Sequence, residues 1–223
     1  MPLGASRLNF LSKVLSVGAA PITWDPLDQM IDTGLRFDAQ SQTSSNTIAG
    51  VSLKTDETKM YLLTTSDVIY QYSLTAGDLS TASYDSKSFN MAGESDIKED
   101  LWISDDGTRL FVCGRSLDTV RSYTMSSAWD ISTASYDSKS LDVSGKETAP
   151  RSLALDPDGN YVYVAGTQNA DVHQYTLSTP FDLATASFTR TFDTSGESLG
   201  QPMGMVFKHD GATMLLTDGD NNG

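Results

Sequence analysis

Nine consecutive residues, STASYDSKS, occur at positions 80–88 and again, unchanged, at 132–140. The two copies start 52 residues apart, and the similarity extends well beyond them. The segments TDETKMYLL, SDDGTRLFV, DPDGNYVYV and KHDGATMLL align at the same period, with Glu57, Gly107, Gly159 and Gly211 at one position. A period of this length indicates a repeat architecture, in which one structural unit is duplicated.

Each repeat has the composition of β-structure. Short runs rich in β-branched and aromatic residues, such as RLFVCG at 109–114 and TVRSYTM at 119–125, alternate with turn residues. Four short strands in about 52 residues are typical of a β-propeller blade, so we predict an all-β propeller. A β-solenoid and an array of sandwich domains are the alternatives, but solenoid rungs are shorter and sandwiches need more strands per unit. Single helical turns are expected after Trp129 and Phe181.

The frame of the repeat divides the chain into an N-terminal arm, residues 1–34, and the propeller repeats, residues 35–223. Within the repeats we expect an outer strand at 35–43, blades at 44–94, 95–146 and 147–198, and a partial blade at 199–223. Propellers commonly close by mixing strands from both termini, so the outer strand is expected to pair with a C-terminal strand. About three and a half blades leave an open sheet edge. We therefore expect the ring to be completed by residues beyond 223 or by other copies.

The repeated nonamer is expected to lead into and form part of the fourth strand of each blade. Its third copy, ATASFTRTF at 184–192, keeps the apolar positions and loses the charges. We therefore predict that Tyr84, Tyr136 and Phe188 are packed, whereas Asp85 and Lys87 face water.

Charge and composition exclude several functional classes. The formal net charge is −14, and nucleic-acid binding needs clustered Lys and Arg, so no nucleic-acid partner is expected. Anionic membranes are disfavoured for the same reason, and no apolar run is long enough to insert into a membrane. Cys113 is the single cysteine, so we interpret it as a small buried side chain rather than part of a disulfide or thiolate zinc site.

The chain offers few residues for catalysis. Its two histidines, His173 and His209, occupy different blade positions and are interpreted as polar strand and turn residues. No phosphate-binding glycine loop, His-x-x-x-His pair or G-x-S-x-G elbow is present. We predict no catalytic residues and no cofactor. The loops near 91–100, 144–151 and 195–202, at one end of the channel, are the candidate ligand-binding loops.

The final residues, DGDNNG, are open to two interpretations. Asp218, Asp220 and Asn222 fit the opening of a calcium loop, in which alternate oxygens converge on a hard cation. The bidentate acid of such a loop would lie beyond residue 223, and the equivalent turns of the other repeats do not keep the pattern. A plain polar hairpin is therefore favoured, with calcium as the alternative.

Two resemblances bear on function. The segments DPDGNYVYV and SDDGTRLFV resemble the PDG-x-x-x-YV blades of YVTN or lactonase-type propellers, a group with both lactone hydrolases and non-catalytic binding proteins. Residues 106–136, which end in AWDISTASY, more closely resemble the blades of marine bacteriophage repeat proteins, and MPLGASRLNFLSK resembles their short N-terminal arms. The second resemblance implies a virion structural protein associated with the tail, neck or fibre.

That resemblance also implies partners. The arm would dock on tail, neck or portal proteins of the virion through apolar side chains, namely Leu8, Phe10, Leu11, Val14, Leu15 and Trp24. The blades would serve assembly or bind a host-surface receptor or glycan, with the chain as a homo-oligomer in the particle. The alternatives are a lactonase-like hydrolase and a bacterial surface or periplasmic binding propeller.

Overall fold

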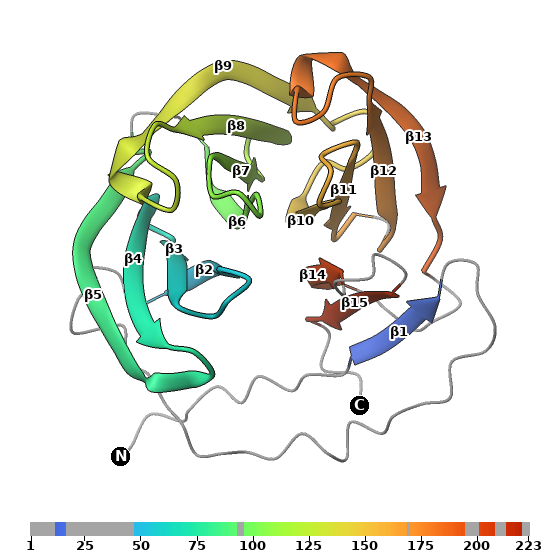
Figure 1. Cartoon of the computed structure of the whole chain (residues 1–223). Helices are drawn as coiled ribbons and strands as arrows, with labels where there is room; N and C mark the ends of the chain where they lie inside the picture. Colours follow the sequence, from blue (N-terminus) through green and yellow to red (C-terminus); the bar gives the residue numbers. More distant parts are fainter. Residues whose placement is uncertain are drawn as a thin grey trace.

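The computed structural model describes residues 12–16, 47–92, 96–168, 170–194, 201–207 and 213–219. They form three four-stranded antiparallel sheets and one three-stranded sheet. Figure 1 shows the sheets side by side around a common centre, with the first strand of each complete blade innermost. The predicted all-β propeller is therefore confirmed, and the sheets described here do not close into a complete ring.

Each complete blade has its four strands in chain order. The first blade contains β2 (Ile48–Leu53), β3 (Lys59–Thr64), β4 (Val68–Thr75) and β5 (Asp78–Asn90). The second contains β6 (Lys98–Ile103), β7 (Arg109–Gly114), β8 (Thr119–Met125) and β9 (Ala134–Asp142). The third contains β10 (Pro150–Leu155), β11 (Tyr161–Gly166), β12 (Val172–Leu177) and β13 (Ala186–Phe192).

The fourth sheet combines the two ends of the chain. Strands β14 (Pro202–Phe207) and β15 (Thr213–Asp218) pair with each other, and β1 (Ser12–Ser16) pairs antiparallel with β15. The strand that comes from the N-terminal part of the chain thus takes the third place in the partial blade. The predicted outer strand at 35–43 lies outside the described residues.

The first hairpin of each blade turns through a residue with positive φ: 58° at Glu57, 70° at Gly107 and 71° at Gly159. Glycine adopts this conformation without the steric cost of a Cβ atom. In the second and third blades the space beside the glycine is filled by the ring of Trp129 or Phe181. The predicted helical turns follow these rings, as 3₁₀ segments at Ile131–Thr133 and Leu183–Thr185.

The fourth strand of each blade contains a β-bulge. Between β4 and β5 the register shifts so that Asp85 and Ser86 have no residue opposite them. In the third blade only Thr189 is extra. This difference of one residue explains why the repeat spacing, 52 between Phe89 and Leu141, falls to 51 between Leu141 and Phe192.

The bulge makes the prediction for the nonamer side chains wrong in part. Asp85 accepts a hydrogen bond from Gln71 Nε2 at 2.7 Å, and the Lys87 ammonium lies 2.6 Å from Asp130 of the next blade, so neither side chain simply faces water. Tyr136 and Phe188 contact one tyrosine each yet remain 44% and 42% exposed. The prediction was drawn from which positions keep an apolar residue in the three copies, and a bulge changes which side of the strand such positions face.

Three of the four hydrophobic clusters among the described residues lie between blades. One cluster joins the first and second blades around Tyr61 and Leu110, and another joins the second and third around Phe111 and Val162. A third cluster, around Met205, joins the third blade to the fourth sheet. Cys113 is buried in the second cluster, as predicted.

Candidate functional site

The first strands of the four sheets, β2, β6, β10 and β14, surround the centre of the propeller (Figure 1). The central channel therefore has two ends, one at the amino ends of these strands and one at their carboxyl ends. Ligand sites of propellers and barrels commonly lie at such openings, because loops from several strands meet there. The two ends of this channel differ sharply in chemistry.

The amino end carries an ion-pair cluster. Glu99 Oε1 lies 2.7 Å from Arg115 Nε and 2.9 Å from Arg151 Nη1. Arg115 belongs to the second blade and Arg151 to the inner strand of the third, so one carboxylate holds two cations from neighbouring blades. Partly buried ion pairs with good geometry fix the position of their elements more than they add stability.

Asp100 lies beside this cluster and crosses the same junction. Its Oδ2 accepts hydrogen bonds from Ser152 Oγ at 2.7 Å and from the Leu153 amide at 3.1 Å, and its Oδ1 accepts one from the Leu101 amide at 2.9 Å. Burial outweighs these bonds and raises the pKa of Asp100 to about 7. The second and third blades are thus joined by a carboxyl group that titrates near neutral pH.

Two further carboxylates at this end bind the second hairpins of their blades. Asp96 Oδ1 accepts hydrogen bonds from the amides of Ser116 and Leu117, at 2.8 and 3.1 Å. Glu147 Oε1 accepts from the Gln168 amide at 3.3 Å and from its own neighbour Ala149 at 2.7 Å, and burial raises the pKa of Glu147. The Asp96 side chain occupies the space that a Cβ atom at Gly114 would need, and the Glu147 side chain does the same at Gly166.

The candidate loops predicted from the sequence lie at this amino end. The structure brings the loops near 91–100 and 144–151 together through the Glu99–Arg151 and Asp100–Ser152 contacts. Residues 93–95 and 195–200 lie outside the described part, so the third loop is represented only by residues 201 and 202. No ligand role of these loops is tested by the geometry.

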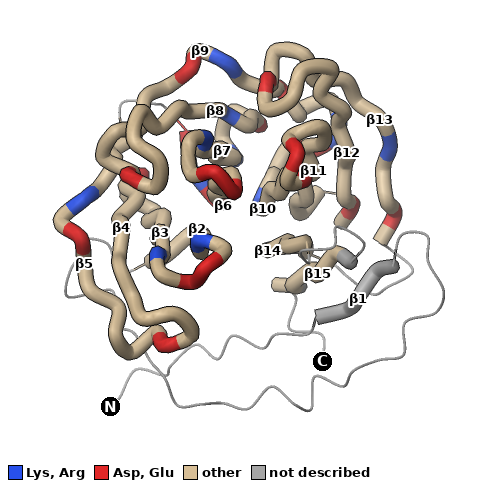
Figure 2. Tube along the Cα trace, in the orientation of Figure 1, with Lys and Arg blue, Asp and Glu red and all other residues tan. Residues whose placement is uncertain are grey.

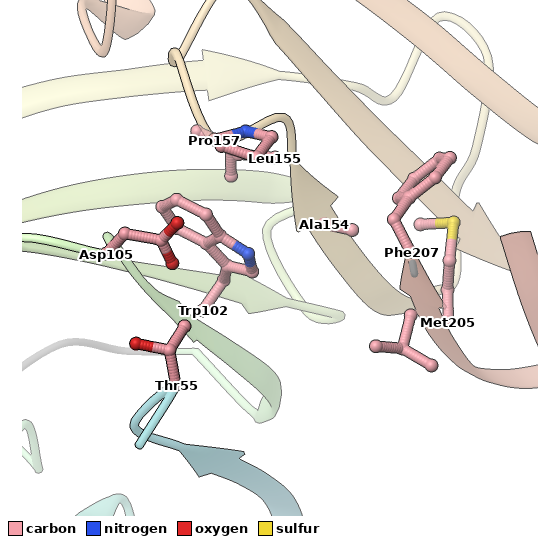
Figure 3. A pocket seen from close by; sticks show the side chains of 9 residues that line it. Thr55, Trp102, Asp105, Ala154, Leu155, Pro157, Met205 and Phe207 are labelled. Atoms are coloured by element: carbon pink, nitrogen blue, oxygen red, sulfur yellow. The ribbon is translucent and has the colours of Figure 1, made fainter. Parts of the chain in front are cut away.

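The carboxyl end of the channel contains a pocket of about 240 Å³ that the sequence did not indicate. Its lining comes from all four sheets, including Thr55, Trp102, Asp105, Pro157 and Val206. Figure 3 shows the Trp102 indole within the lining, with Asp105 and Thr55 near it and Met205 and Phe207 on the far side. Drug-sized ligands need about 300 Å³ or more, so this pocket suits a single small group.

The rim of this pocket is acidic. The turns that follow β2, β6 and β10 carry Asp56, Glu57, Asp105, Asp106, Asp156 and Asp158. Figure 2 shows these acidic turns facing the centre of the molecule. A ring of carboxylates in a chain of net charge −14 disfavours anionic ligands at this end.

The individually predicted residues are dispersed. Of the calcium candidates, Asp218 ends β15, whereas Asp220 and Asn222 lie outside the described residues. Of the docking residues, Val14 and Leu15 lie in β1 opposite Leu215 and Met214. The other four, Leu8, Phe10, Leu11 and Trp24, lie outside the described part. Both roles stay predictions.

The remaining candidates for chemistry are structural or undescribed. His173 is buried on β12 and its Nδ1 lies 2.9 Å from Thr191 Oγ1, while burial lowers the pKa of the imidazole. His209 lies outside the described residues. Within the described ranges no group of three or more His, Cys, Asp or Glu side chains is placed to hold a metal ion. No helix among them is long and apolar enough to span a membrane.

Comparison with known proteins supports the fold alone. The sequence matches no protein-family model and no curated protein. A protein from Lactobacillus plantarum is similar in structure, with a TM-score of 0.56 and 16% identity, over 78% of this chain and 49% of that one. A candidate 6-phosphogluconolactonase from Bacteroides fragilis has a TM-score of 0.55 and 14% identity, over 77% and 48%.

A chain of the nidogen–laminin complex is similar at a TM-score of 0.51 and 16% identity, over 77% of this chain and 56% of that one. This chain therefore spans about half the length of the solved structures that it matches. At such low identity the likeness extends to the propeller fold and no further.

Proposed function

We propose that the chain is a structural protein of a bacteriophage virion, associated with the tail, neck or fibre, that displays a non-enzymatic β-propeller for assembly or host-surface binding. The blade at residues 106–136 carries this proposal, because its sequence resembles the blades of phage repeat proteins. The residues of this segment that carry the resemblance make structural contacts within the blade. Gly107 makes room for Trp129, and Asp130 accepts from the Ser132 amide at the start of the 3₁₀ turn.

The charged groups of the channel support a scaffold role. Glu99 is held by two arginines, and Asp96 and Glu147 are bound by backbone amides of the second hairpins. Groups engaged in this way fix blades and turns in place. A rigid propeller of this kind suits a spacer or a binding module on a particle.

Attachment to the particle would use residues 1–34, with other virion proteins as partners. In the structure Ser12–Ser16 belong to the fourth sheet, so a truncation that leaves β1 in place removes residues 1–11. This segment contains three of the predicted docking residues, Leu8, Phe10 and Leu11.

A lactonase-like hydrolase is the second candidate, and the name of the Bacteroides fragilis neighbour favours it. The acidic rim argues against a phosphate-bearing substrate at the carboxyl end of the channel, because carboxylates repel phosphate. The arginines at the amino end are engaged by Glu99.

Deleting residues 1–11 in the phage that carries the gene tests the proposal. We expect the truncated chain to be absent from density-purified particles by immunoblotting, while Leu79→Ser, a change at an exposed blade position, leaves incorporation intact. Full incorporation of the truncated chain would contradict attachment through the arm. Hydrolysis of 6-phosphogluconolactone by the purified full chain would contradict the non-enzymatic part of the proposal.

A further inference from the structure

The pocket at the carboxyl end of the channel presents one charged group on a surface that is otherwise mostly carbon. Two of the residues that line it, Thr55 and Asp105, are polar, and the rest are apolar or aromatic. Among the described residues of the lining, Asp105 alone carries a charge. A cavity of about 240 Å³ with such walls favours a small ligand that pairs with one carboxylate and buries carbon.

The turn that carries Asp105 is stabilised by a different acid. Its neighbour Asp106 accepts a hydrogen bond from the Thr108 amide at 2.9 Å and so holds the turn together. The Asp105 carboxylate makes no hydrogen bond or ion pair with any other residue that the structure describes. Thr55 and Pro157 occupy its place in the turns of the first and third blades, so the repeat does not require an acid there. This carboxylate is therefore available to a ligand.

The Trp102 indole is held in place at the same pocket. Its ring stacks on Phe181, with ring centroids 6.4 Å apart and an interplanar angle of 26°, and it contacts Phe111 edge to face at 5.9 Å. The side chain is nevertheless only half-buried and lines the pocket, where Figure 3 shows it together with Asp105. An aromatic ring attracts cations through its quadrupole and a carboxylate attracts them through its charge, so this wall favours a positively charged ligand.

The lining also selects among cations. Calcium and magnesium ions take several oxygen ligands, whereas only Asp105 and Thr55 supply side-chain oxygens among the described lining residues. A primary ammonium group is strongly hydrated and would lose more hydrogen bonds to water than these two residues return. A quaternary ammonium group has no N–H to satisfy, and its methyl groups can pack on the apolar walls. The lining therefore suits a quaternary ammonium group best.

We propose that this pocket binds a quaternary ammonium group with no phosphate beside it, held by the Trp102 ring and the Asp105 carboxylate. The acidic turns at the rim favour a cation over an anion at the entrance. The proposal rests on the pocket and is independent of the virion role, so its test can fail without affecting the test of particle incorporation, and the reverse.

Choline and its neutral isostere 3,3-dimethylbutan-1-ol are matched probes, because they differ only in whether nitrogen or carbon carries the methyl groups. Saturation-transfer NMR with the full chain should show choline binding with a dissociation constant on the order of 1 mM, and the isostere binding about tenfold more weakly. The indole N–H signal of Trp102 should shift as choline is added. An unmoved Trp102 signal, or equal binding of the isostere, would overturn the proposal.

Three substitutions test the named contacts. Asp105→Asn, at an exposed position, should weaken choline binding about tenfold, and Trp102→Phe, which leaves a ring with a weaker attraction for cations, should weaken it about threefold. Asp158→Asn is the matched control, since it removes the same charge from an exposed rim position that does not line the pocket, and it should change the affinity less than about twofold.

The indole signal of Trp129, whose ring packs at Gly107, shows whether each variant is folded. Unchanged choline affinity in folded Asp105→Asn would overturn the proposal. Equal losses in Asp105→Asn and Asp158→Asn would do the same, because they would attribute binding to the net charge of the rim instead of to the pocket.

Phosphocholine distinguishes a free ammonium ligand from a lipid headgroup, because it holds the same ammonium group beside a phosphate. The carboxylates of the rim repel that phosphate, so phosphocholine should bind at least about threefold more weakly than choline at low salt. Phosphocholine binding as tight as that of choline would overturn the proposed exclusion of a neighbouring phosphate and would indicate a headgroup ligand.

Discussion

The junction between the first and second blades and the junction between the second and third are copies of one another in the sequence, yet different groups join them. In the first, Gln71 Oε1 accepts a hydrogen bond from the Ile131 amide at 2.9 Å, and Tyr61 Oη donates to the Trp129 carbonyl at 2.9 Å. In the second, Asp100 and the Glu99–Arg151 pair cross between inner strands. Both junctions also have an outer Lys–Asp ion pair, Lys87–Asp130 and Lys139–Asp182. Apart from these pairs, the first junction is joined by neutral groups away from the channel, and the second by charged groups beside it.

The inner strands explain this difference. Gly50 of β2 occupies the place that Asp100 occupies on β6, and a Cβ atom at Gly50 would lie 3.0 Å from Asp100 Cα and its Oδ1. The first blade therefore has no side chain there that could reach across, and the close approach of β2 and β6 depends on that absence. The repeat preserves the backbone and the apolar contacts, while the polar contacts at each junction depend on single residues.

The largest effect is expected from the shared feature of the two junctions, the glycine in each first turn. Gly107→Ala and Gly159→Ala each place a Cβ atom at positive φ and against the ring of Trp129 or Phe181. Each should lower the free energy of unfolding by about 3 kcal/mol, from backbone strain and overpacking together. Urea unfolding followed by tryptophan fluorescence measures the loss.

Gly145→Ala is the control, since nothing lies within 4 Å of a Cβ atom at Gly145, and it should change stability by less than about 0.5 kcal/mol. If either turn variant were as stable as this control, the stability of its blade would not depend on glycine at that turn. A large loss at one turn and none at the other would show that the two junctions differ in their apolar packing as well as in their polar contacts.

The next largest effect separates the junctions by pH. The pKa of Asp100 is raised by burial to about 7, above that of an unfolded aspartate, so the folded state binds its proton more tightly. The contribution of Asp100 is therefore fully present below about pH 4 and is lost as the pH rises to about 7. We expect the stability of the unchanged chain relative to Asp100→Asn to fall through this window, by on the order of 3 kcal/mol.

Taking the difference between the two proteins removes the titration of the other carboxylates, which is common to both. Chemical unfolding at intervals between pH 4 and pH 8 provides the measurement. A pH-independent difference would show that Asp100 stays ionised throughout and would leave the two junctions alike in their response to pH.

Gln71→Ala is the corresponding change at the first junction. It removes the acceptor of the buried Ile131 amide and a donor to Asp85, and a buried polar group left without a partner costs about 1–3 kcal/mol. Because an amide does not titrate, we expect Gln71→Ala to lose about 2 kcal/mol relative to the unchanged chain, by the same amount at pH 6 and at pH 8. A loss that grew with pH would contradict the neutral character of this junction.

The two junctions also show which features of the fold could be predicted from the sequence. The period of 52 residues, the Asp-Gly turns and the 3₁₀ segments after Trp129 and Phe181 were predictable, because each is encoded by residues close together in the chain. The bulge at Asp85 and Ser86 was not predicted, although the shorter third repeat was a sign of it. Counting along one strand does not reveal how many residues its partner leaves unpaired.

The site was less predictable than the fold. The sequence placed Asp100 only at the end of the candidate loop near 91–100, because its partners Ser152 and Leu153 lie in another blade and the repeat places glycine at the same position in β2. The pocket around Trp102 takes its lining from four sheets, at the end of the channel opposite the predicted loops. Contacts of this kind depend on how blades are set against each other, and a one-dimensional period does not specify that.

The smallest effect is expected from the outer ion pairs, a polar contact that both junctions share. Lys87 lies 2.6 Å from Asp130 and Lys139 lies 2.7 Å from Asp182, each bridging neighbouring blades at a partly exposed site. Exposed pairs contribute about 0.2–1 kcal/mol, so Lys87→Gln and Lys139→Gln should each cost less than about 1 kcal/mol and should cost the same amount.

The hydrogen bond from Lys87 lowers the pKa of Asp130, so its contribution is present at neutral pH and is lost as the pH falls through the range of an aspartate. Unfolding measurements at pH 7 and pH 3, in low and high salt, provide the test. If the two variants lost unequal free energies of unfolding at pH 7, the junctions would differ at their outer ion pairs as well as at Gln71 and Asp100.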